Sequence, residues 1–208
     1  MNKTLRGVGA VALVAATALV TVSSVSATPK AASAAPQKPR TASVTGAGDV
    51  RLTFAPDRDV RSFSFDARAT PYTRPMPGVP QGLPTDATGT VRVAHRVAAN
   101  GLTVRFAARV DCLVTAERTA TLTAVVTEAD APVADLVGRR LGFSVYDGPG
   151  GDRVGFSWAV VNADQGPDGQ WREGSAGTCM GPAPFAPVTD GDYRVRHAEL
   201  PPSPADNN

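Results

Sequence analysis

The chain has few of the side chains that carry nucleophilic, acid–base or metal chemistry in enzymes. Its 208 residues include two histidines, His95 and His197, and two cysteines, Cys112 and Cys179. An imidazole that acts as a general acid or base must therefore belong to His95 or His197. The cysteines lack the paired C-x-x-C or H-x-x-x-H spacing of zinc sites, so a zinc site shared with the histidines is the less favoured use of them. We expect no metal and no cofactor.

The chain also lacks an apolar run long enough to span a membrane. The uncharged residues 7–22 are bordered by Thr and Ser and fall short of the about 20 apolar residues that a spanning helix needs. They follow Lys3 and Arg6 and precede small residues at 25–27 and 32–34. This order is typical of a secretory signal peptide. We predict a signal peptide over residues 1–27, with cleavage as late as residue 34, and a secreted, extracellular protein without a membrane span.

The predicted mature chain has no excess of positive charge. Two of the 21 lysines and arginines, Lys3 and Arg6, lie in the predicted signal peptide, which leaves 19 basic against 19 acidic side chains. Nucleic-acid-binding proteins carry a basic patch or stripe. The neutral balance therefore gives no support for a nucleic-acid partner.

Helical periodicity is missing as well, and only residues 130–140 form a weak helix candidate. Alternation of apolar and polar residues, which is typical of strands with one face on a core, occurs instead in residues 50–54, 63–67, 91–95, 102–114, 120–126 and 193–197. Several such strands at short spacing favour an all-β fold, a single antiparallel β-sandwich or a partly open barrel. We expect a flexible leader at 28–48, rich in Ala, Pro, Ser and Thr, a β-rich domain at 49–201 and a disordered tail at 202–208.

Cys112 shares the apolar parity of its segment with Val110 and Val114, so we expect its sulfur to point into the core. In an oxidising compartment, two cysteines favour a single disulfide. We therefore predict one disulfide, between Cys112 and Cys179.

Residues 140–158 contain two similar segments around a Gly- and Asp-rich connection, which predicts a β-hairpin. One face of the hairpin is apolar and includes Phe156 and Trp158, so we expect Trp158 in the core. The other face carries only small side chains (Gly142, Ser144, Gly155 and Ser157). Small side chains favour close packing of another segment on this face over a shallow groove. Trp171, in a Gly-rich loop, remains as the exposed aromatic on which a sugar ring could stack.

Residues 70–88 contain five prolines, which exclude a central strand. A loop of this length is either functional or a stiff connection that covers a sheet edge. Tyr72 and Arg74 are its candidate ligand contacts.

Residues 110–123, 142–148, 182–188 and 197–201 resemble a group of secreted actinobacterial β-domain proteins often named repetin. The resemblance covers residues 49–201, although Ala116 stands where the group usually has glycine. It implies an all-β extracellular domain and transfers no catalytic residue.

Ser157 lies in a segment close to the G-x-S-x-G motif of hydrolases, but that motif needs a helix after the serine and this segment reads as a strand. Aspartates at 57 and 59, 147 and 152, and 190 and 192 match turn positions better than a calcium loop. The favoured interpretation is a non-catalytic binding or surface-interaction module with an extracellular protein or glycan as partner. A secreted hydrolase, or a protease inhibitor that presents residues 70–88, is the alternative.

The predicted cleavage sites give a first test. The secreted protein is expected to start at Thr28 or Ala35, because these residues follow the two small-residue sites. The intact mass of the protein from culture supernatant decides between them. Recovery of the full-length chain from the membrane fraction would contradict secretion.

Overall fold

The computed structural model describes residues 41–55, 57–158 and 162–204. The predicted signal peptide, most of the predicted leader and the last four residues of the predicted tail lie outside these ranges. No helix among the described residues has the length and apolar character to cross a membrane.

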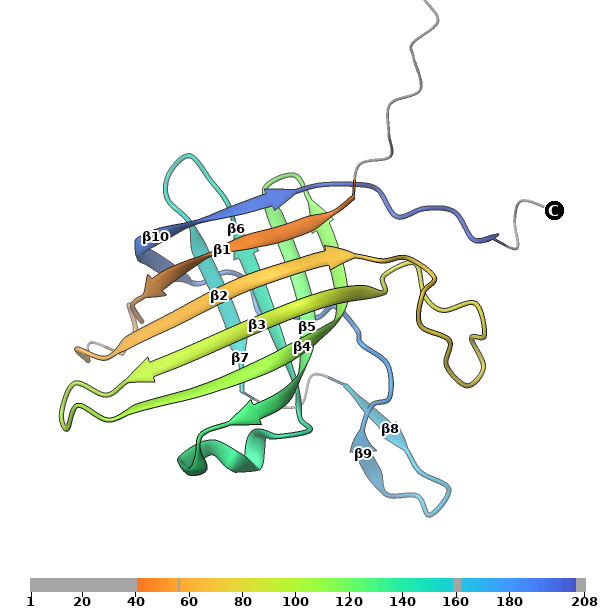
Figure 1. Cartoon of the computed structure of the whole chain (residues 1–208), viewed down its shortest axis with the longest axis horizontal. Coiled ribbons are helices and arrows are strands. Elements are labelled where there is room, and N and C mark those ends of the chain that lie inside the picture. The colour runs from red at the N-terminus through yellow and green to blue at the C-terminus, as the bar shows by residue number, and fades with distance from the viewer. Residues whose placement is uncertain (1–40, 56, 159–161, 205–208) are drawn as a thin grey trace, which may run out of the picture. The chain divides into compact units, whose positions relative to one another are not determined.

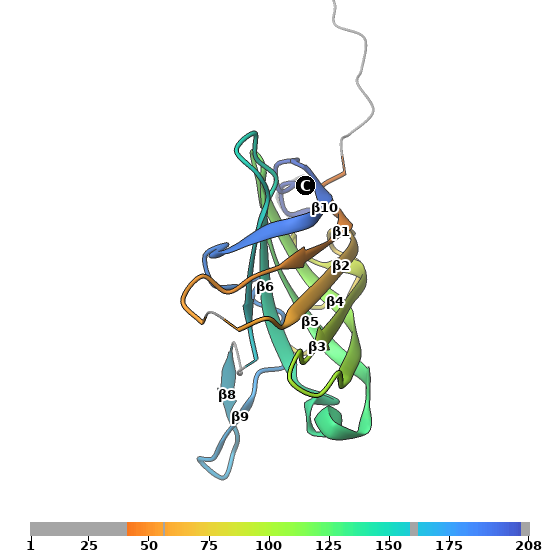
Figure 2. The ribbon, with the colours of Figure 1, turned by 90° about the vertical axis from the view of Figure 1, so that its left-hand side faces the viewer.

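Within the described residues, eight strands close into an antiparallel barrel in the order β1-β10-β7-β6-β5-β4-β3-β2. Their bounds are β1 Ser43–Val50, β2 Val60–Ala69, β3 Ala87–Arg96, β4 Thr103–Ala116, β5 Thr119–Ala129, β6 Arg140–Tyr146, β7 Arg153–Ser157 and β10 Ala186–Arg196. Two short strands, β8 Ala163–Gln165 and β9 Trp171–Glu173, form a separate hairpin that projects away from the barrel (Figures 1 and 2). The predicted antiparallel all-β fold is confirmed, and of the two architectures left open the chain forms a barrel.

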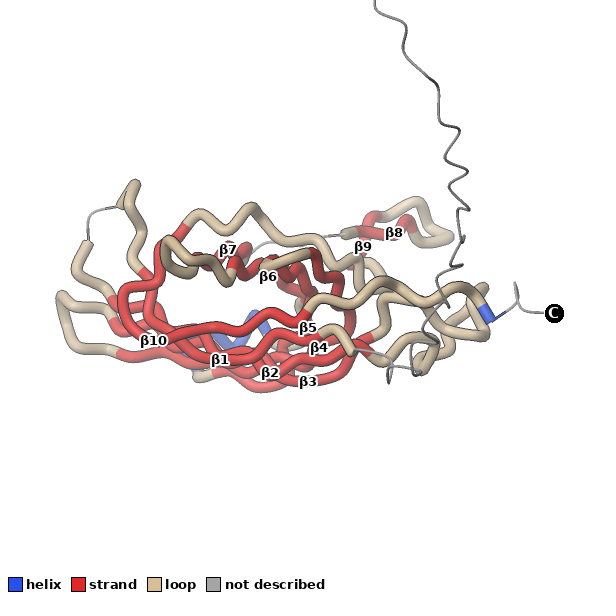
Figure 3. The backbone as a smooth tube through the Cα atoms, turned by 90° about the horizontal axis from the view of Figure 1, so that it is seen from above, coloured by secondary structure: helices blue, strands red, loops and turns tan. Residues whose placement is uncertain are grey.

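The strands run in two directions. In Figure 1, β10, β1, β2 and β3 cross β5, β6 and β7 steeply, and Figure 3 shows these two groups on opposite sides of the barrel. Apolar side chains of both groups, including Phe63, Leu122 and Phe143, fill the interior between them. The alternation in the sequence places these residues on the inner face, because successive side chains of a strand point to opposite faces.

Strand β4 contains a β-bulge where it passes between the two groups. Val110 pairs with Ala124 and Cys112 pairs with Thr123, so Asp111 is the extra residue. The bulge reverses the parity of the strand beyond it. Leu113 therefore joins the core, while Cys112 lies on the outer face beside Thr123. The expectation that the Cys112 sulfur points into the core is wrong for this reason.

The predicted disulfide is confirmed, and it fixes a segment that crosses the outside of the barrel. Residues 174–185, which we call the strap, lead from β9 to β10. Cys179 of the strap is bonded to Cys112, with 5.0 Å between the Cα atoms. A Cβ atom at Gly177 would lie 2.7 Å from the Cβ of Cys112, so only glycine allows this approach.

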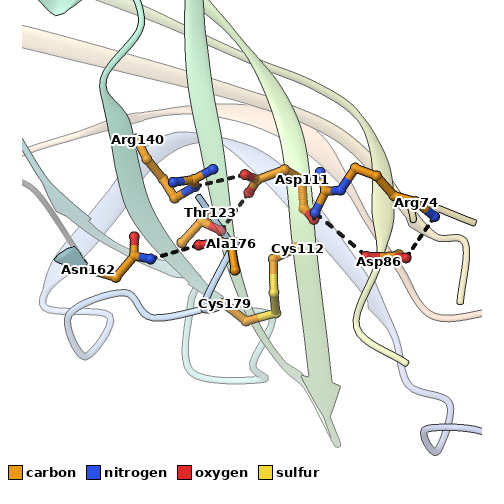
Figure 4. The surroundings of a disulfide bond; sticks show 9 residues. All are labelled: Arg74, Asp86, Asp111, Cys112, Thr123, Arg140, Asn162, Ala176 and Cys179. Atoms are coloured by element: carbon orange, nitrogen blue, oxygen red, sulfur yellow. Dashed lines mark hydrogen bonds and ion pairs between the residues drawn. A yellow bond between two sulfur atoms is a disulfide. The ribbon is translucent and has the colours of Figure 1, made fainter. Parts of the chain in front are cut away.

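A buried ion pair holds the start of the strap (Figure 4). Arg140 donates through Nε to Asp111 Oδ2 at 2.7 Å, and Thr123 Oγ1 donates to the other carboxylate oxygen at 2.7 Å. The remaining guanidinium nitrogens of Arg140 donate to the carbonyls of Gly174 and Ser175. A buried charge pair of this kind is stable because its other polar atoms are hydrogen-bonded.

The small face of the hairpin β6–β7 packs against the strap. The Ser144 hydroxyl donates to the carbonyl of Pro182. A Cβ atom at Gly155 would lie 2.6 Å from the same oxygen. The close-packing interpretation of this face is confirmed.

The barrel closes through a short seam between β10 and β7. Only Ala186 and Pro187 of β10 pair with β7, at Val154 and Arg153, whereas β10 pairs along most of its length with β1. Beyond the seam, two aspartate side chains accept backbone hydrogen bonds from β10 that a neighbouring strand would otherwise accept. Asp152 accepts from Tyr193 N at 2.7 Å, and Asp147 accepts from Val195 N at 2.9 Å.

Two expectations about the ends of elements need correction. Residues 43–48 were assigned to a flexible leader by composition but form part of β1. They pair with β2 on one side and β10 on the other, and this pairing outweighs their weak local signal. The helix candidate at 130–140 is limited to a 3₁₀ helix, η1 Ala131–Leu136.

Removal of the disulfide tests the role of the strap. Replacing Cys112 and Cys179 together by serine is expected to lower the free energy of unfolding by roughly 4 kcal/mol, because the bond closes a loop with a sequence separation of 67 residues. Urea unfolding measures the change. Amide hydrogen exchange in the variant should show that β10 loses more protection than β5. Unchanged protection in β10 would contradict a role of the strap in closure.

Candidate functional site

A largely apolar cavity of about 390 Å³ opens at one end of the barrel, which we call the mouth. Strands β2, β3, β4 and β7 contribute inward-facing residues, and the β1–β2 connection and η1 form the rim. The lining comprises Leu52, Arg61, Val93, His95, Val104, Phe106, Val133, Asp135, Leu136, Phe156 and Trp158.

Three aromatic rings form one wall of the cavity. The rings of Phe156 and Trp158 lie 4.9 Å apart between centroids. Phe106 packs edge-on against Trp158 at 5.6 Å, with 83° between the planes. These distances are typical of favourable aromatic pairs.

Trp158 is 42% exposed, so the expectation that it lies in the core is wrong. Its parity was assigned correctly, since it packs beside Phe156 and stacks on Phe63 at 6.3 Å. However, it follows the last residue of β7, beyond the two residue pairs that join β7 to β10. No strand covers that position among the described residues, and the indole therefore reaches the mouth.

A cluster of charged groups also lies at the mouth, at the start of β2 and the end of β3. Arg61 has the inward parity of Phe63, and its guanidinium donates to both carboxylate oxygens of Asp57, at 3.1 and 2.7 Å. Asp59 Oδ2 lies 3.7 Å from the same guanidinium and 2.8 Å from His95 Nε2. Asp59 also accepts from Ala98 N at 2.9 Å. The cluster thus joins the β1–β2 connection to the end of β3.

These hydrogen bonds shift the ionisation of both aspartates. The Arg61 guanidinium holds the pKa of Asp57 below its ordinary value. The backbone N–H of Ala98, followed by His95, lowers the pKa of Asp59. In return, the hydrogen bond to Asp57 raises the pKa of Arg61.

Two of the three predicted ligand contacts are engaged with their own chain. The Tyr72 hydroxyl donates to the carbonyl of Pro201 at 3.1 Å. Arg74 donates to the carbonyl of Asp111 at 2.5 Å and lies 3.6 Å from Asp86 (Figure 4). Asp86 Oδ2 in turn accepts from the backbone of Arg74 and Leu83. The Pro-rich loop is therefore fixed against β4, as the interpretation of a stiff connection requires.

Trp171, the third predicted contact, lies on β9 and is 69% exposed. The hairpin that carries it is held by Asp168, which accepts both guanidinium bonds of Arg172. Trp171 and the Pro-rich loop belong to separate elements.

The residues considered for hydrolysis are distributed over different places. Ser157 has the parity opposite to Phe156 and so lies on the outer face of β7, whereas His95 lines the interior cavity. His197 contacts Thr115 through Nδ1 and Glu199 through Nε2. Residues 159–161, where a nucleophile elbow would begin its helix, lie outside the described residues.

Four of the six turn aspartates, Asp57, Asp59, Asp147 and Asp152, make side-chain contacts within the chain. Asp147 and Asp152 cap β10, and Asp57 binds Arg61. Among the described residues, no group of three or more His, Cys, Asp or Glu side chains is placed to hold a metal ion.

A second depression, of about 670 Å³, lies on the outer face of β1–β5. Ser62, Ser64, Ala94 and Ala107 form its floor, and Arg92 and Arg105 stand beside them. It is therefore lined by small and charged side chains and lies outside the barrel.

Comparison of the chain with protein-family models, with curated proteins and with solved structures gave no match. The resemblance to secreted actinobacterial β-domain proteins stays an expectation.

Sequence reasoning did not assign Arg61, Phe106 or Phe156 to a site. Their alternation marks them as inward-facing, but it does not tell a core position from one near an open end. The one available signal was the charged Arg61 at the apolar parity of Phe63 and Phe65, because a buried charge requires a partner.

The lowered pKa values of Asp57 and Asp59 predict acid sensitivity at the mouth. In the unfolded chain both carboxyls bind a proton more tightly than in the folded chain, with a pKa of about 3.9. Their stabilising contribution is therefore complete above about pH 4 and is lost as the pH falls through the lower folded values. Asp59→Asn should reduce the fall in unfolding free energy between about pH 5 and pH 2, as measured by urea unfolding. Asp66→Asn, on the outer face of β2, is the control. An unchanged pH profile in Asp59→Asn would contradict the assignment.

Proposed function

We propose that this protein is a secreted, non-catalytic binding protein whose ligand site is the cavity at the mouth of the barrel. The observation that carries the proposal is the half-exposed Trp158 beside an apolar cavity that holds no side chain of the described residues. Tryptophan is enriched at binding interfaces, where one end of the indole is apolar and the other meets solvent.

The size and position of the cavity support the proposal. Small-molecule pockets measure about 300–1,000 Å³ and consist mostly of apolar walls with a few polar groups. The mouth of a β-barrel is one of the places where they occur most often. The cavity of about 390 Å³, with Arg61 and His95 as polar lining, has these properties.

Secretion is supported by three features of the chain. Residues 1–27 have the order of a signal peptide. The Cys112–Cys179 bond favours an oxidising compartment. The resemblance to secreted β-domain proteins agrees with both.

The alternatives have less support. A hydrolase would need Ser157 and an imidazole on one face, and Ser157 and His95 lie on opposite faces of the barrel wall. A protease inhibitor would need an extended segment to present. The tip of the Pro-rich loop is instead a tight turn, in which Met76 and Val79 exchange two backbone hydrogen bonds. A glycan that stacks on the exposed Trp171 remains the alternative partner.

Binding of an apolar probe tests the site. N-phenyl-1-naphthylamine, which becomes fluorescent in apolar surroundings, is expected to bind one site per molecule. Trp158→Ala should weaken binding roughly tenfold, because it removes an aromatic wall of the cavity. Trp171→Ala is the matched control and should bind as the unmodified protein does. Equal loss in both variants, or binding that Trp158→Ala leaves unchanged, would contradict the mouth as the site.

A further inference from the structure

We infer that the mouth cavity binds an uncharged, flat aromatic small molecule with one hydrogen-bond acceptor oxygen, such as a ring carbonyl. This inference rests on the proposed function and adds the chemical class of the ligand. It follows from the depth of the cavity, the geometry of its aromatic wall, the hydrogen-bond donors of Arg61 and the balance of charge around it.

The cavity suits a compact ligand better than a long alkyl chain. Its inner end is closed by the packed core, since Phe63 lies 4.8 Å from Phe156 and 6.4 Å from Phe143 between ring centroids. Both Phe63 and Phe143 are fully buried. A chain that extends along the barrel axis would have to displace these rings, and interiors at this packing density do not yield without a large cost.

The aromatic wall suits a flat ring system. Phe106 and Trp158 are nearly perpendicular, and Phe156 is tilted by 46° to Trp158. A flat aromatic ligand that lies against this wall can contact one ring edge-to-face and another in an offset stack. Both arrangements are favourable for aromatic pairs.

Arg61 lines the cavity and supplies hydrogen-bond donors to it. Its guanidinium has five N–H groups and gives two of them, one from each terminal nitrogen, to Asp57, so donors remain for a ligand. A guanidinium has donors and no acceptor, so the complementary group on the ligand is an acceptor oxygen. His95 Nε2 is bonded to Asp59, so we assign the donor role to Arg61.

The charges around the mouth favour an uncharged ligand. A cation in the cavity would meet Arg61, the charged side chain that is most buried there. An anion would meet the carboxylates of Asp57, Asp59 and Asp135, and a cation would find these carboxylates already paired with Arg61 and Arg139. Burial of a charge without a free partner is costly, so both ionic forms are disfavoured.

Four derivatives of one tricyclic ring system test the inference. Fluorene and 9-fluorenone share a flat shape and differ by a carbonyl oxygen, while fluorene-9-carboxylate and 9-aminofluorene carry opposite charges at neutral pH. Each competes with N-phenyl-1-naphthylamine for the protein. Fluorenone is expected to bind about tenfold more tightly than fluorene, since it gains a hydrogen bond to a charged donor. Both charged compounds should bind more weakly than fluorenone.

Arg61→Met removes all N–H donors of this side chain and keeps an unbranched side chain of similar length. In this variant the ratio between fluorenone and fluorene should fall to about one, while fluorene binds as before. Arg105→Ala, on the outer face of β4 beside Phe106, is the matched control and should keep the ratio. A measurement on the unmodified protein avoids any effect of the substitution on folding. The ¹⁵N-resolved guanidinium N–H resonances of Arg61 should move with fluorenone and not with fluorene.

The outcomes separate the ligand class from the site. Equal affinity for fluorene and fluorenone, or tighter binding of either charged compound, would overturn the inference and leave the mouth as the binding site. If neither the probe nor any of the four ring compounds binds, the proposed function itself is overturned.

Discussion

The attachment of the strap to the outside of β4 is the constraint on which the rest of the structure depends. The bulge at Asp111 brings a carboxylate and the Cys112 sulfur to the outer face, where Arg140 and Cys179 bind them. The strap, residues 174–185, leads directly into β10. Because β10 has only two residue pairs with β7, its position beside β7 relies on this attachment and on the two aspartates that cap its free edge. The contacts that close the barrel at this seam therefore lie largely on its outer face.

The same short seam gives the barrel its open end. Strand β7 extends past its two contacts with β10, and Trp158 follows directly after it at the mouth. Also at the mouth, Asp57 and Asp59 hold Arg61 and His95 at the ends of β2 and β3. The aromatic rings and the Arg61 guanidinium, which is paired with Asp57, therefore line one cavity that the packed core limits in depth. These features together define the kind of ligand that we propose.

The sequence predicted the parts of this fold that depend on local alternation. The hairpin of β6 and β7, its apolar and small faces and the Cys112–Cys179 bond were all predicted and are confirmed. The side of the strand on which Cys112 lies was wrong, because a bulge reverses parity and has no local sequence signature here. Residues 43–48 became a strand only through pairing with two distant strands. Likewise, Trp158 differs from core residues of the same parity by its position at an open end, which depends on the closure of the barrel rather than on its neighbours in the chain.

The central claim is that a ligand enters the barrel and does not bind on its outside. Two-dimensional NMR of the protein with 9-fluorenone tests it most directly, because one spectrum reports on both faces of the same strand. The account predicts chemical-shift changes at Phe106, Phe156 and the Trp158 indole, which line the cavity. The methyl groups of Ala94 and Ala107, in the outer depression, should stay unchanged. Shifts confined to Ala94, Ala107 and Trp171 would contradict the account.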